Sequence, residues 1–579
     1  MDPQSAPGLN EKSQSSELNR NLNQEPEHDQ HQHKEQHQDQ GQDQDQGQEQ
    51  DKDQEQQRRQ GKEQSRGPGQ SGGQVRGKGR IPGLDALRGL AILLMVLSGI
   101  IPFVELPAWM YHIQIPPPDH IFNPEIRGIG WVDLVFPLFL FSMGVAIPLA
   151  FTRRFNALGP ASEGMPGIWA HRLRQLGRVA ERGFLLGFFA IFLQHVRPYA
   201  LQPSGEEAWA WWTGMAGMTL LFLIYTRLPS HWPGHITRTI RAVGFIGAIL
   251  LMAFLTFPDG SGFSLYRSDI ILIVLTNMAV FTTLIWLATR RRPGVRFSIL
   301  AILAALMLSA NEPGWISSFW SWSPVPWLFQ FDYLKYLFIL IPATIIGDEI
   351  ISSGSGESGR YKDIETNVSS SAGGGMGASK AGWMDNLFKE KAKYHGVAAA
   401  GMVLTIVILA GLVSRHVFAT LVAALVLMAG AFLLLRSLKG GNVVLFRRLL
   451  LWGAFWLVLG LCLEPFQGGI RKDHATFSYF FVTAGVSVWL LVSFMVWTDE
   501  LRGEGVLSLL ISNGRNPMIA YAGMQNFLLS VLVLTGLHDF LLQITAINPW
   551  VGVARAAIYT LVLAWLVMAL TRRQIYWKT

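Results

Sequence analysis

Apolar runs recur along this chain from about residue 81 to its end, and short basic segments separate them. Each run is apolar all round, whereas a helix in a soluble core keeps a polar face at 3.6-residue spacing. About 20 apolar residues span the hydrocarbon of a bilayer, where only helices or closed barrels satisfy the backbone. The runs lack the alternation of barrel strands. We therefore expect an all-α fold, a polytopic transmembrane bundle of about 11–14 spans.

The pattern places these spans near residues 83–104, 130–151, 183–196, 209–226, 242–257, 269–289, 297–310, 331–347, 396–413, 417–435, 449–464, 477–497, 517–535 and 548–570. Basic residues set the orientation, because cytoplasmic loops are enriched in lysine and arginine. With the N-terminus inside, the external loops hold only Arg127, Arg197, Arg267, Arg415, Arg471 and Lys472. We expect both termini in the cytoplasm and, as the membrane, the cytoplasmic (inner) membrane of a bacterium.

Two segments differ from the apolar pattern. Residues 1–80 are rich in glutamine and cannot bury enough apolar area to offset their ordering entropy, which predicts a disordered cytoplasmic tail. Residues 348–395 include a Gly/Ser-rich stretch, which predicts a flexible cytoplasmic linker. The linker would separate a first membrane part, 81–347, from a second, 396–579.

Composition excludes several classes of function. The formal net charge is +7, but the basic residues follow membrane topology and form no aromatic-lined patch, so we expect no nucleic-acid partner. The single cysteine, Cys462, excludes an intrachain disulfide or a thiolate metal cluster, and buried packing is its expected role. The zinc-binding HExxH pattern is missing, as is the phosphate-binding GxxxxGK pattern, and we expect no metal.

The loop at 105–129 and the span start after it carry the first candidate catalytic residues, His112, His120 and Asp133. A neutral imidazole can take a proton from an amine or a hydroxyl, or can itself be acylated. Asp133 at a membrane boundary is costly unless it has a partner, so it either orients a histidine or caps its helix. The alternative for each histidine is a packing or hydrogen-bonding role.

Basic residues on the cytoplasmic side are candidates for binding a phosphorylated carrier. Asp85 and Arg88 are spaced i, i+3, so they can pair on one helix face, or Arg88 can lie near a carrier phosphate. Arg174, Arg178 and Arg182 repeat every four residues and would suit the phosphates of coenzyme A. A positive-inside flank explains the same stripe.

Two polar segments lie in the second membrane part. The external sequence RKDH supplies Arg471, Lys472, Asp473 and His474, which would line a site for a polar or anionic sugar or would be ordinary interfacial charges. The cytoplasmic sequence SNGRNP, with Asn513, Arg515 and Asn516, predicts a turn and a helix start at its proline, with a carrier contact as the alternative.

The most specific motifs are IPGLDALRGLAILLMVLSGIIPF and GIGWVDLVFPLFLFSMGVAIPLA, in the first two spans. Together with FSYFFVTAG at 477–485 and GRNPMIAY at 514–521, they resemble the heparan-α-glucosaminide N-acetyltransferase family and its bacterial relatives. The resemblance implies that an acetyl group passes from cytosolic acetyl-CoA, a co-substrate, to an amino sugar on the far side. It also implies a catalytic histidine at the non-cytoplasmic end of the first span.

That resemblance assigns the catalytic role to His112, which follows an aromatic residue in WMYH as in the family. His120 is the alternative, because a PPPDH stretch is inserted before Asp133. The expected function is a membrane acyltransferase acting on an envelope or extracellular sugar or glycan. The competing hypothesis is a non-catalytic transporter or flippase-like protein for a polar or lipid-linked solute, because intramembrane charges and interrupted spans also mark transport pathways.

Overall fold

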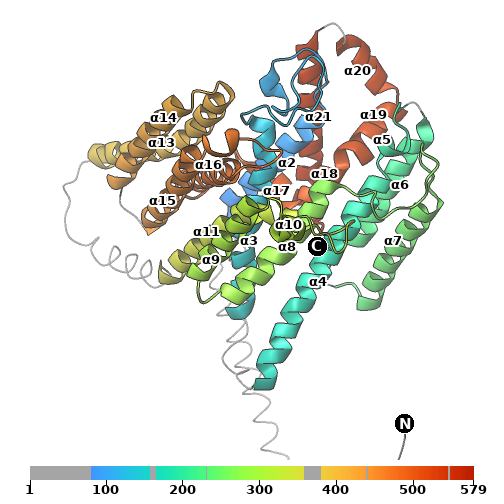
Figure 1. Ribbon diagram of the computed structural model, residues 1–579, viewed down its shortest axis with the longest axis horizontal. Helices are drawn as coiled ribbons and strands as arrows, with labels where there is room; N and C mark the ends of the chain where they lie inside the picture. Colours follow the sequence, from blue (N-terminus) through green and yellow to red (C-terminus); the bar gives the residue numbers. More distant parts are fainter. Residues whose placement is uncertain are drawn as a thin grey trace, which may run out of the picture. The chain divides into compact units, whose positions relative to one another are not determined.

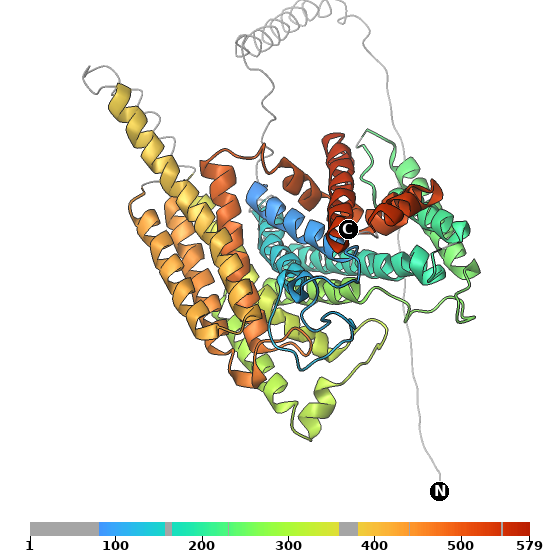
Figure 2. The same cartoon turned by 90° about the horizontal axis from the view of Figure 1, so that it is seen from above.

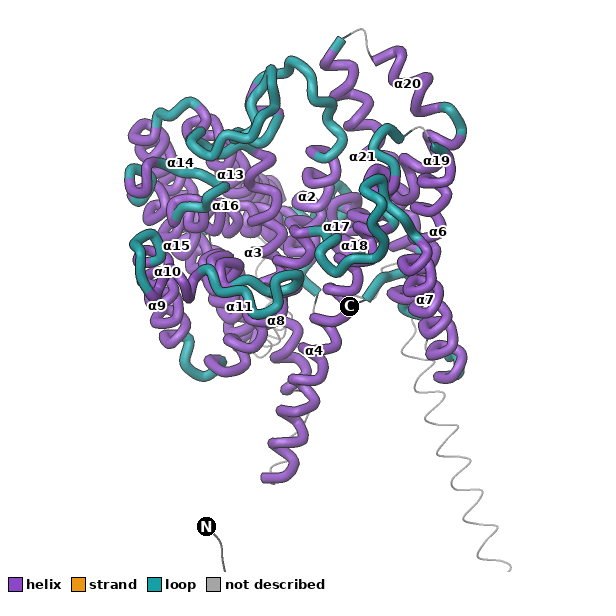
Figure 3. Tube along the Cα trace, turned by 45° about the vertical axis from the view of Figure 1, so that its right-hand side comes forward, coloured by secondary structure: helices purple, strands orange, loops and turns teal. Residues whose placement is uncertain are grey.

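The fold is known from a computed structural model that describes residues 80–156, 165–205, 207–229, 231–357, 380–438, 441–545 and 548–578. Every regular element in these ranges is a helix, and Figure 3 shows only helices and loops there. The prediction of an all-α membrane protein is confirmed. The predicted tail, up to residue 79, lies outside the described residues, as does the Gly/Ser-rich stretch 358–379.

The α-helices are α2 (Pro82–Ser98), α3 (Trp131–Asn156), α4 (Met165–His195), α5 (Pro198–Leu201), α6 (Ala208–Tyr225), α7 (Gly234–Phe254), α8 (Ile270–Thr289), α9 (Gly294–Ser309), α10 (Trp315–Trp320), α11 (Leu337–Glu357), α13 (Lys380–Val413), α14 (Val417–Arg436), α15 (Gly441–Cys462), α16 (Phe477–Met495), α17 (Ser508–Arg515), α18 (Pro517–Gly523), α19 (Ser530–Leu534), α20 (Leu537–Thr545) and α21 (Pro549–Arg572). Short 3-10 helices are η1 (Ala108–Met110), η3 (Phe331–Tyr336) and η4 (Phe466–Gly468), and π-helical segments are η5 (Val496–Glu500) and η6 (Met524–Leu529).

Ten helical segments within the described residues are long and apolar enough to cross a membrane. The other predicted spans coincide with α2, α4, α9 and α11, which are short or carry charges along part of their length. The predicted linker is too long: α11 continues to Glu357 and α13 already begins at Lys380. Helix propagation adds a hydrogen bond for every residue it fixes, so a span readily extends beyond the bilayer into a segment such as KEKAKYH.

Residues 80–579 form one compact unit, in which the second membrane part packs against the first. In Figure 1, α13 to α16 lie on the left, α4, α6 and α7 on the right, and α2 and α17 between them. Helix α16 is the most buried span and contacts α2, α3, α11, α13 and α15. The first and second membrane parts therefore belong to a single compact unit.

Two glycines bring α2 and α17 into backbone contact. A Cβ on Gly89 would lie 1.8 Å from the carbonyl oxygen of Leu510, and a Cβ on Gly514 would lie 1.8 Å from that of Asp85. Small residues allow membrane helices this close approach. The LDALRG and GRNP motifs, which lie far apart in the sequence, are therefore two faces of one helix contact.

Candidate functional site

His112 lies between two carboxylates. Its Nδ1 atom is 3.1 Å from Oδ1 of Asp133, and its Nε2 atom is 3.0 Å from Oδ2 of Asp473. The Asp133 side chain is 1% exposed, whereas that of Asp473 is 45% exposed and that of His112 is 14% exposed. One ring nitrogen therefore faces the protein interior, and the other faces a carboxylate that solvent can reach.

The beginning of α3 holds Asp133 in place. Its Oδ2 atom accepts hydrogen bonds from the backbone N–H of Gly130, at 2.9 Å, and of Ile113, at 3.4 Å. A carboxylate that reaches back to the residue before its helix is typical of a helix N-terminus. Its Oδ1 atom is buried, and it gains a hydrogen bond when Nδ1 of His112 carries the proton. Both roles predicted for Asp133, helix cap and histidine partner, thus occur together in its geometry.

Gln114 fastens the two loops that meet at His112. Its side-chain oxygen accepts a hydrogen bond from the backbone N–H of Asp473 at 2.9 Å, and its amide nitrogen donates to the carbonyl oxygens of Asp473 and Pro124. Figure 2 shows the loop after α2, in blue, beside the orange loop before α16. Gln114 is buried and gave no signal in the sequence, because an isolated glutamine has no recognisable pattern.

The charge state of Asp473 follows from its neighbours. Burial alone raises the pKa of this carboxyl, but the hydrogen bond with His112 and the positive charge of Lys472 outweigh burial and lower the pKa below its usual value. Asp473 is therefore an anion at neutral pH. The sequence placed it in the RKDH cluster, but its contact with His112 spans 361 positions, a separation at which sequence pattern gives no pairing.

The FSYF motif of α16 also reaches this site. The Tyr479 hydroxyl donates a hydrogen bond to the backbone carbonyl of Asp133 at 3.0 Å and is buried. Thr476 caps α16 through the N–H of Tyr479. The FSYFFVTAG motif at 477–485 thus supports the first turn of α3.

His120 lies apart from the His112 cluster. Its ring packs edge-on against Phe103 and Tyr111, with centroid distances of 5.1 and 4.6 Å. Both of its ring nitrogens are buried, and neither has a hydrogen-bond partner among the described residues. This placement corresponds to the packing alternative.

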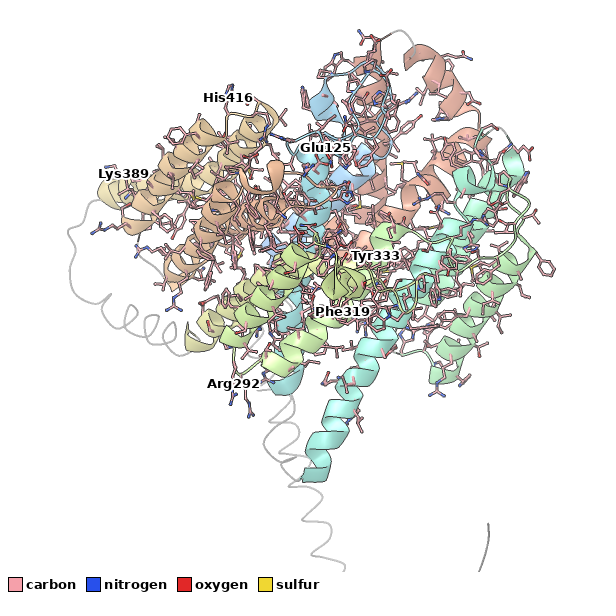
Figure 4. The ribbon with its side chains drawn as sticks, viewed as in Figure 1. Glu125, Arg292, Phe319, Tyr333, Lys389 and His416 are labelled. Carbon is pink, nitrogen blue, oxygen red and sulfur yellow. The ribbon has the colours of Figure 1, made fainter. Side chains whose placement is uncertain are left out.

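The predicted acceptor residues differ in their surroundings. Arg471 forms an ion pair with Glu125 at 3.0 Å, and Figure 4 labels Glu125 on the loop after α2. Lys472 approaches Asp133, with 3.9 Å between Nζ and Oδ1. His474 is exposed. Of the four residues predicted there, Asp473 contacts His112 directly and Lys472 approaches its partner Asp133.

At the other end of α2, charged residues connect helices. Arg88 donates hydrogen bonds to the hydroxyl and the carbonyl oxygen of Ser142 at 3.4 and 3.2 Å, and lies 3.7 Å from Asp85. Arg515 lies 3.3 Å from the same Asp85 carboxylate. This arrangement is the ion pair that the i, i+3 spacing predicted.

The predicted turn at SNGRNP is wrong: its first four residues are the last of α17, and only Asn516 lies outside a helix. The predicted helix start is confirmed, because Pro517 is the first residue of α18. Asn516 donates hydrogen bonds to Thr571 and to the carbonyl of Ile575, and the amide of Asn513 donates to the carbonyl of Ala564. Both asparagines therefore attach the junction of α17 and α18 to α21 and the residues that follow it.

The arginine stripe lies on the part of α4 that Figure 1 shows extending away from the other helices. Arg174 and Arg178 are exposed there, and Arg182 is half-buried. Cys462, expected to be buried, is instead exposed at the last position of α15. An apolar run in a membrane helix has a lipid-facing side, so an apolar position does not require burial in protein.

Comparison with known proteins gives a family without an assigned activity. Residues 80–350 match the model of a domain of unknown function (DUF5009). No curated protein matches the chain. The matched residues include Arg88, His112, Gln114 and Asp133 but end before Asp473, so the second half of the chain completes the cluster. Over residues 80–350 the chain is thus similar to a family whose function remains to be assigned.

Proposed function

We propose that this chain is a membrane-embedded acyltransferase that passes an acetyl group from cytosolic CoA to a sugar on the opposite, envelope or extracellular, side. The observation that carries the proposal is His112, held with one ring nitrogen on buried Asp133 and the other on half-exposed Asp473. An oriented imidazole with a buried carboxylate partner is the arrangement that general-base and nucleophilic catalysis require.

The geometry supports a defined proton path. The backbone N–H of Gln114 lies 3.2 Å from Nδ1 of His112, so a neutral ring can accept there and carry its proton on Nε2, or carry the proton on Nδ1 and donate it to Asp133. In the second form Nε2 has a free lone pair. An acceptor ammonium would bind to Asp473 and lose its proton to Nε2. The imidazolium then formed lies between two carboxylates, which stabilise its charge in the transition state.

The bond changes are those of acyl transfer. The neutral amine of the sugar attacks the thioester carbonyl, a C–N bond forms, the C–S bond breaks, and the second proton of the attacking nitrogen passes to the departing CoA thiolate. A hydroxyl acceptor instead gives its one proton to Nε2 as the C–O bond forms, and the imidazolium passes that proton to the thiolate. Transfer through an acylated His112 differs only in that the imidazole attacks first and the sugar second.

The distance between the His112 site and the Arg88 cluster suits such a transfer. Asp133, at the site, and Ser142, which binds Arg88, both lie on α3 and are about 14 Å apart along a helix that rises about 1.5 Å per residue. That is about half the hydrocarbon thickness of roughly 30 Å. On the cytoplasmic side, the candidates for the CoA phosphates are Arg174 and Arg178, whose side chains are exposed.

The test is transfer of label from radioactive acetyl-CoA to an amino sugar by the full chain in lipid nanodiscs. We expect labelled product with the native chain and with His120→Ala, and loss of product with His112→Ala. The two histidines share a loop, so His120→Ala is the matched control. Equal product from both variants, or no product from the native chain, would reject the proposal.

Transport is the second candidate function, and one feature favours it. The last part of the bundle before α21 is interrupted: α17 ends at Arg515, α18 begins at Pro517, and η6 is π-helical. Discontinuous membrane helices line substrate sites in transporters, and π-helical turns are frequent at functional sites. Uptake of a labelled amino sugar into proteoliposomes without acetyl-CoA would favour transport over catalysis.

A further inference from the structure

A cavity of about 720 Å³ lies between α4, α7, α8 and the loop before η3, away from the residues already described. Its volume falls within the roughly 300–1,000 Å³ of small-molecule sites. Phenylalanine, aliphatic and glycine residues make up most of its wall. Of its polar lining residues, Thr276 donates to the carbonyl of Leu272, and Asn277 donates to the carbonyls of Ile273 and Leu328. The wall therefore suits a hydrocarbon ligand.

The cavity opens through the outer surface of the helices rather than toward the bundle interior. Its lining residues Phe184, Ile249 and Phe263 are exposed. Helices α7 and α8 are among the segments apolar enough to span a membrane. The lining residues of α8 begin at Thr276, about 9 Å below the start of that helix at Ile270. The opening thus lies at the depth of lipid chains.

The opening of the cavity lies in the same half of the membrane as the His112 site. Helices α3 and α8 are in contact and run parallel. Phe136, near the start of α3, packs edge-on against Tyr336 of η3, which itself contacts α8, whereas Phe151, near the end of α3, packs at a tilt against Trp286 near the end of α8. Asp133 is in the first turn of α3. The cavity and the site therefore both lie toward the helix ends that carry the loop after α2.

A continuous segment joins the cavity to the site. Trp327, Leu328 and Phe329 line the cavity, and η3 follows directly. At the end of η3, the ring of Tyr336 packs on Phe136 at 5.4 Å and on Phe480 at 5.9 Å. Phe136 lies one turn after Asp133, and Phe480 follows Tyr479, which binds Asp133. The six residues of η3 cover about 12 Å at the 3-10 rise of about 2 Å per residue.

We propose that this cavity holds the hydrocarbon chain of a lipid-anchored sugar, whose head group reaches His112 and Asp473 from the membrane side. The inference rests on the proposed acyltransferase function and names its acceptor class. A free sugar would leave the apolar cavity unused. A chain that moves from the bilayer into the cavity exchanges one apolar environment for another, so its packing against the wall, rather than the hydrophobic effect, would hold it there. The bilayer supplies such chains directly at the opening.

Gly187 offers a way to fill the cavity without disturbing its wall. It lines the cavity on α4, and a Cβ added there would lie 3.8 Å from Thr276 and 3.9 Å from Leu328, which is ordinary contact. Gly187→Phe therefore places a ring in the space of the chain. Gly177→Phe is the matched control, because Gly177 is on the same helix outside the cavity and its Cβ would meet nothing within 4 Å.

The probe is glucosamine carrying a dodecyl chain with a photoreactive diazirine near its end, and its comparison is methyl glucosaminide. Both are offered to the full chain in nanodiscs. We expect photolabel on peptides of α4, α7 and α8, and displacement of that label by dodecyl glucosaminide but not by dodecanol. Gly187→Phe should reduce this labelling and raise the KM for the dodecyl acceptor at least tenfold, with no change for methyl glucosaminide. Gly177→Phe should match the native chain.

Two results would overturn the inference. One is label spread over all lipid-facing helices or displaced equally by dodecanol, which marks ordinary boundary lipid. The other is a well-folded Gly187→Phe variant, judged by its elution in detergent, whose KM for the dodecyl acceptor is unchanged. Specific labelling of the cavity without acetyl transfer to either acceptor would reject the acyltransferase proposal while supporting the cavity as a binding site for a lipid-anchored sugar.

Discussion

The two ends of α2 both carry charged residues from strong sequence motifs, yet they are built for different purposes. At one end, Asp85 pairs with Arg88 and Arg515 where α2 and α17 touch through glycine backbones. At the other, in the loop that follows α2, His112 lies between Asp133 and Asp473. The first cluster joins helices through ions of fixed charge. The second holds an imidazole between two carboxylates, one buried and one that solvent can reach.

The difference teaches that motif strength and chemical role are separate properties. LDALRG is the clearer motif, and the structure explains it by close packing and an ion pair. The histidine loop is irregular in sequence, with an inserted PPPDH stretch, and it carries the arrangement suited to chemistry. Residues that determine packing tolerate little change in size, and this alone is enough to make a motif conspicuous.

The largest expected contrast between the two clusters is the side of the membrane on which each lies. In a Cys462→Ser background, cysteines at His416 and His474 should react with an impermeant maleimide in intact cells, and cysteines at Arg292 and Lys389 should react only after lysis. All of these positions are exposed. Figure 4 shows His416 near the top of the view and Arg292 near the bottom. Reaction of Arg292→Cys in intact cells would reverse the orientation on which the comparison depends.

The next largest effect is on catalysis. His112→Ala should lower acetyl transfer by about 10²–10⁴-fold, the usual loss on removing a general base, with expression unchanged. Arg515→Ala, at the other end of α2, should keep at least half of the native rate. Equal losses in both variants would mean that the clusters do not differ in role.

Asp133→Asn should give an intermediate loss of about 10–100-fold in kcat, because an amide can hold the loop but stabilises an imidazolium less well than a carboxylate does. Its Oδ2 position would still accept from Gly130 and Ile113. Asp85→Asn is the matched substitution in the first cluster and should leave kcat unchanged. A lowered Tm with native kcat for Asp133→Asn would instead indicate a purely structural carboxylate.

Removing the ion pair should affect stability modestly. Arg515 is partly exposed, and the buried Asp85 keeps Arg88 as a second partner, so Arg515→Ala should cost about 1 kcal/mol or less, seen as a small fall in Tm in nanodiscs. Gly514→Ala should cost more, because its Cβ would collide with the Asp85 carbonyl, a backbone atom that cannot move aside. A larger loss in Arg515→Ala than in Gly514→Ala would show that charge rather than close packing holds the helices together.

The smallest effect is the pH dependence of the Asp473 contact. Because its folded-state pKa lies below the ordinary value of 3.8, the contact contributes stability that is fully present above that value and is lost as the pH falls through the lowered pKa. The difference in Tm between the native chain and Asp473→Asn should therefore be constant from pH 7 to 5 and shrink below pH 4. A difference that grows on acidification would contradict the assignment.

Sequence reasoning reached the fold and half of the candidate site. The spans were predictable because bilayer length sets the length of each apolar run, but α13 begins earlier than predicted because its charged extension is helical without being apolar. His112 and Asp133 flank one loop, so their contact was foreseeable. The contacts of Asp473 with Gln114 and His112 could not be foreseen, because they depend on which spans pack together. Apolar runs of similar composition do not show which helices will be neighbours.

The glycine contact between α2 and α17 has a consequence for how the protein is made. Asp85 is synthesised 430 residues before its partner Arg515, which at about 5–20 residues per second corresponds to roughly 20–90 s of translation. During that interval α2 is in the membrane without α17, the helix whose backbone packs against Gly89. The N-terminal half therefore completes its packing only near the end of synthesis, and until α17 is made Asp85 has Arg88, on its own helix, as its partner.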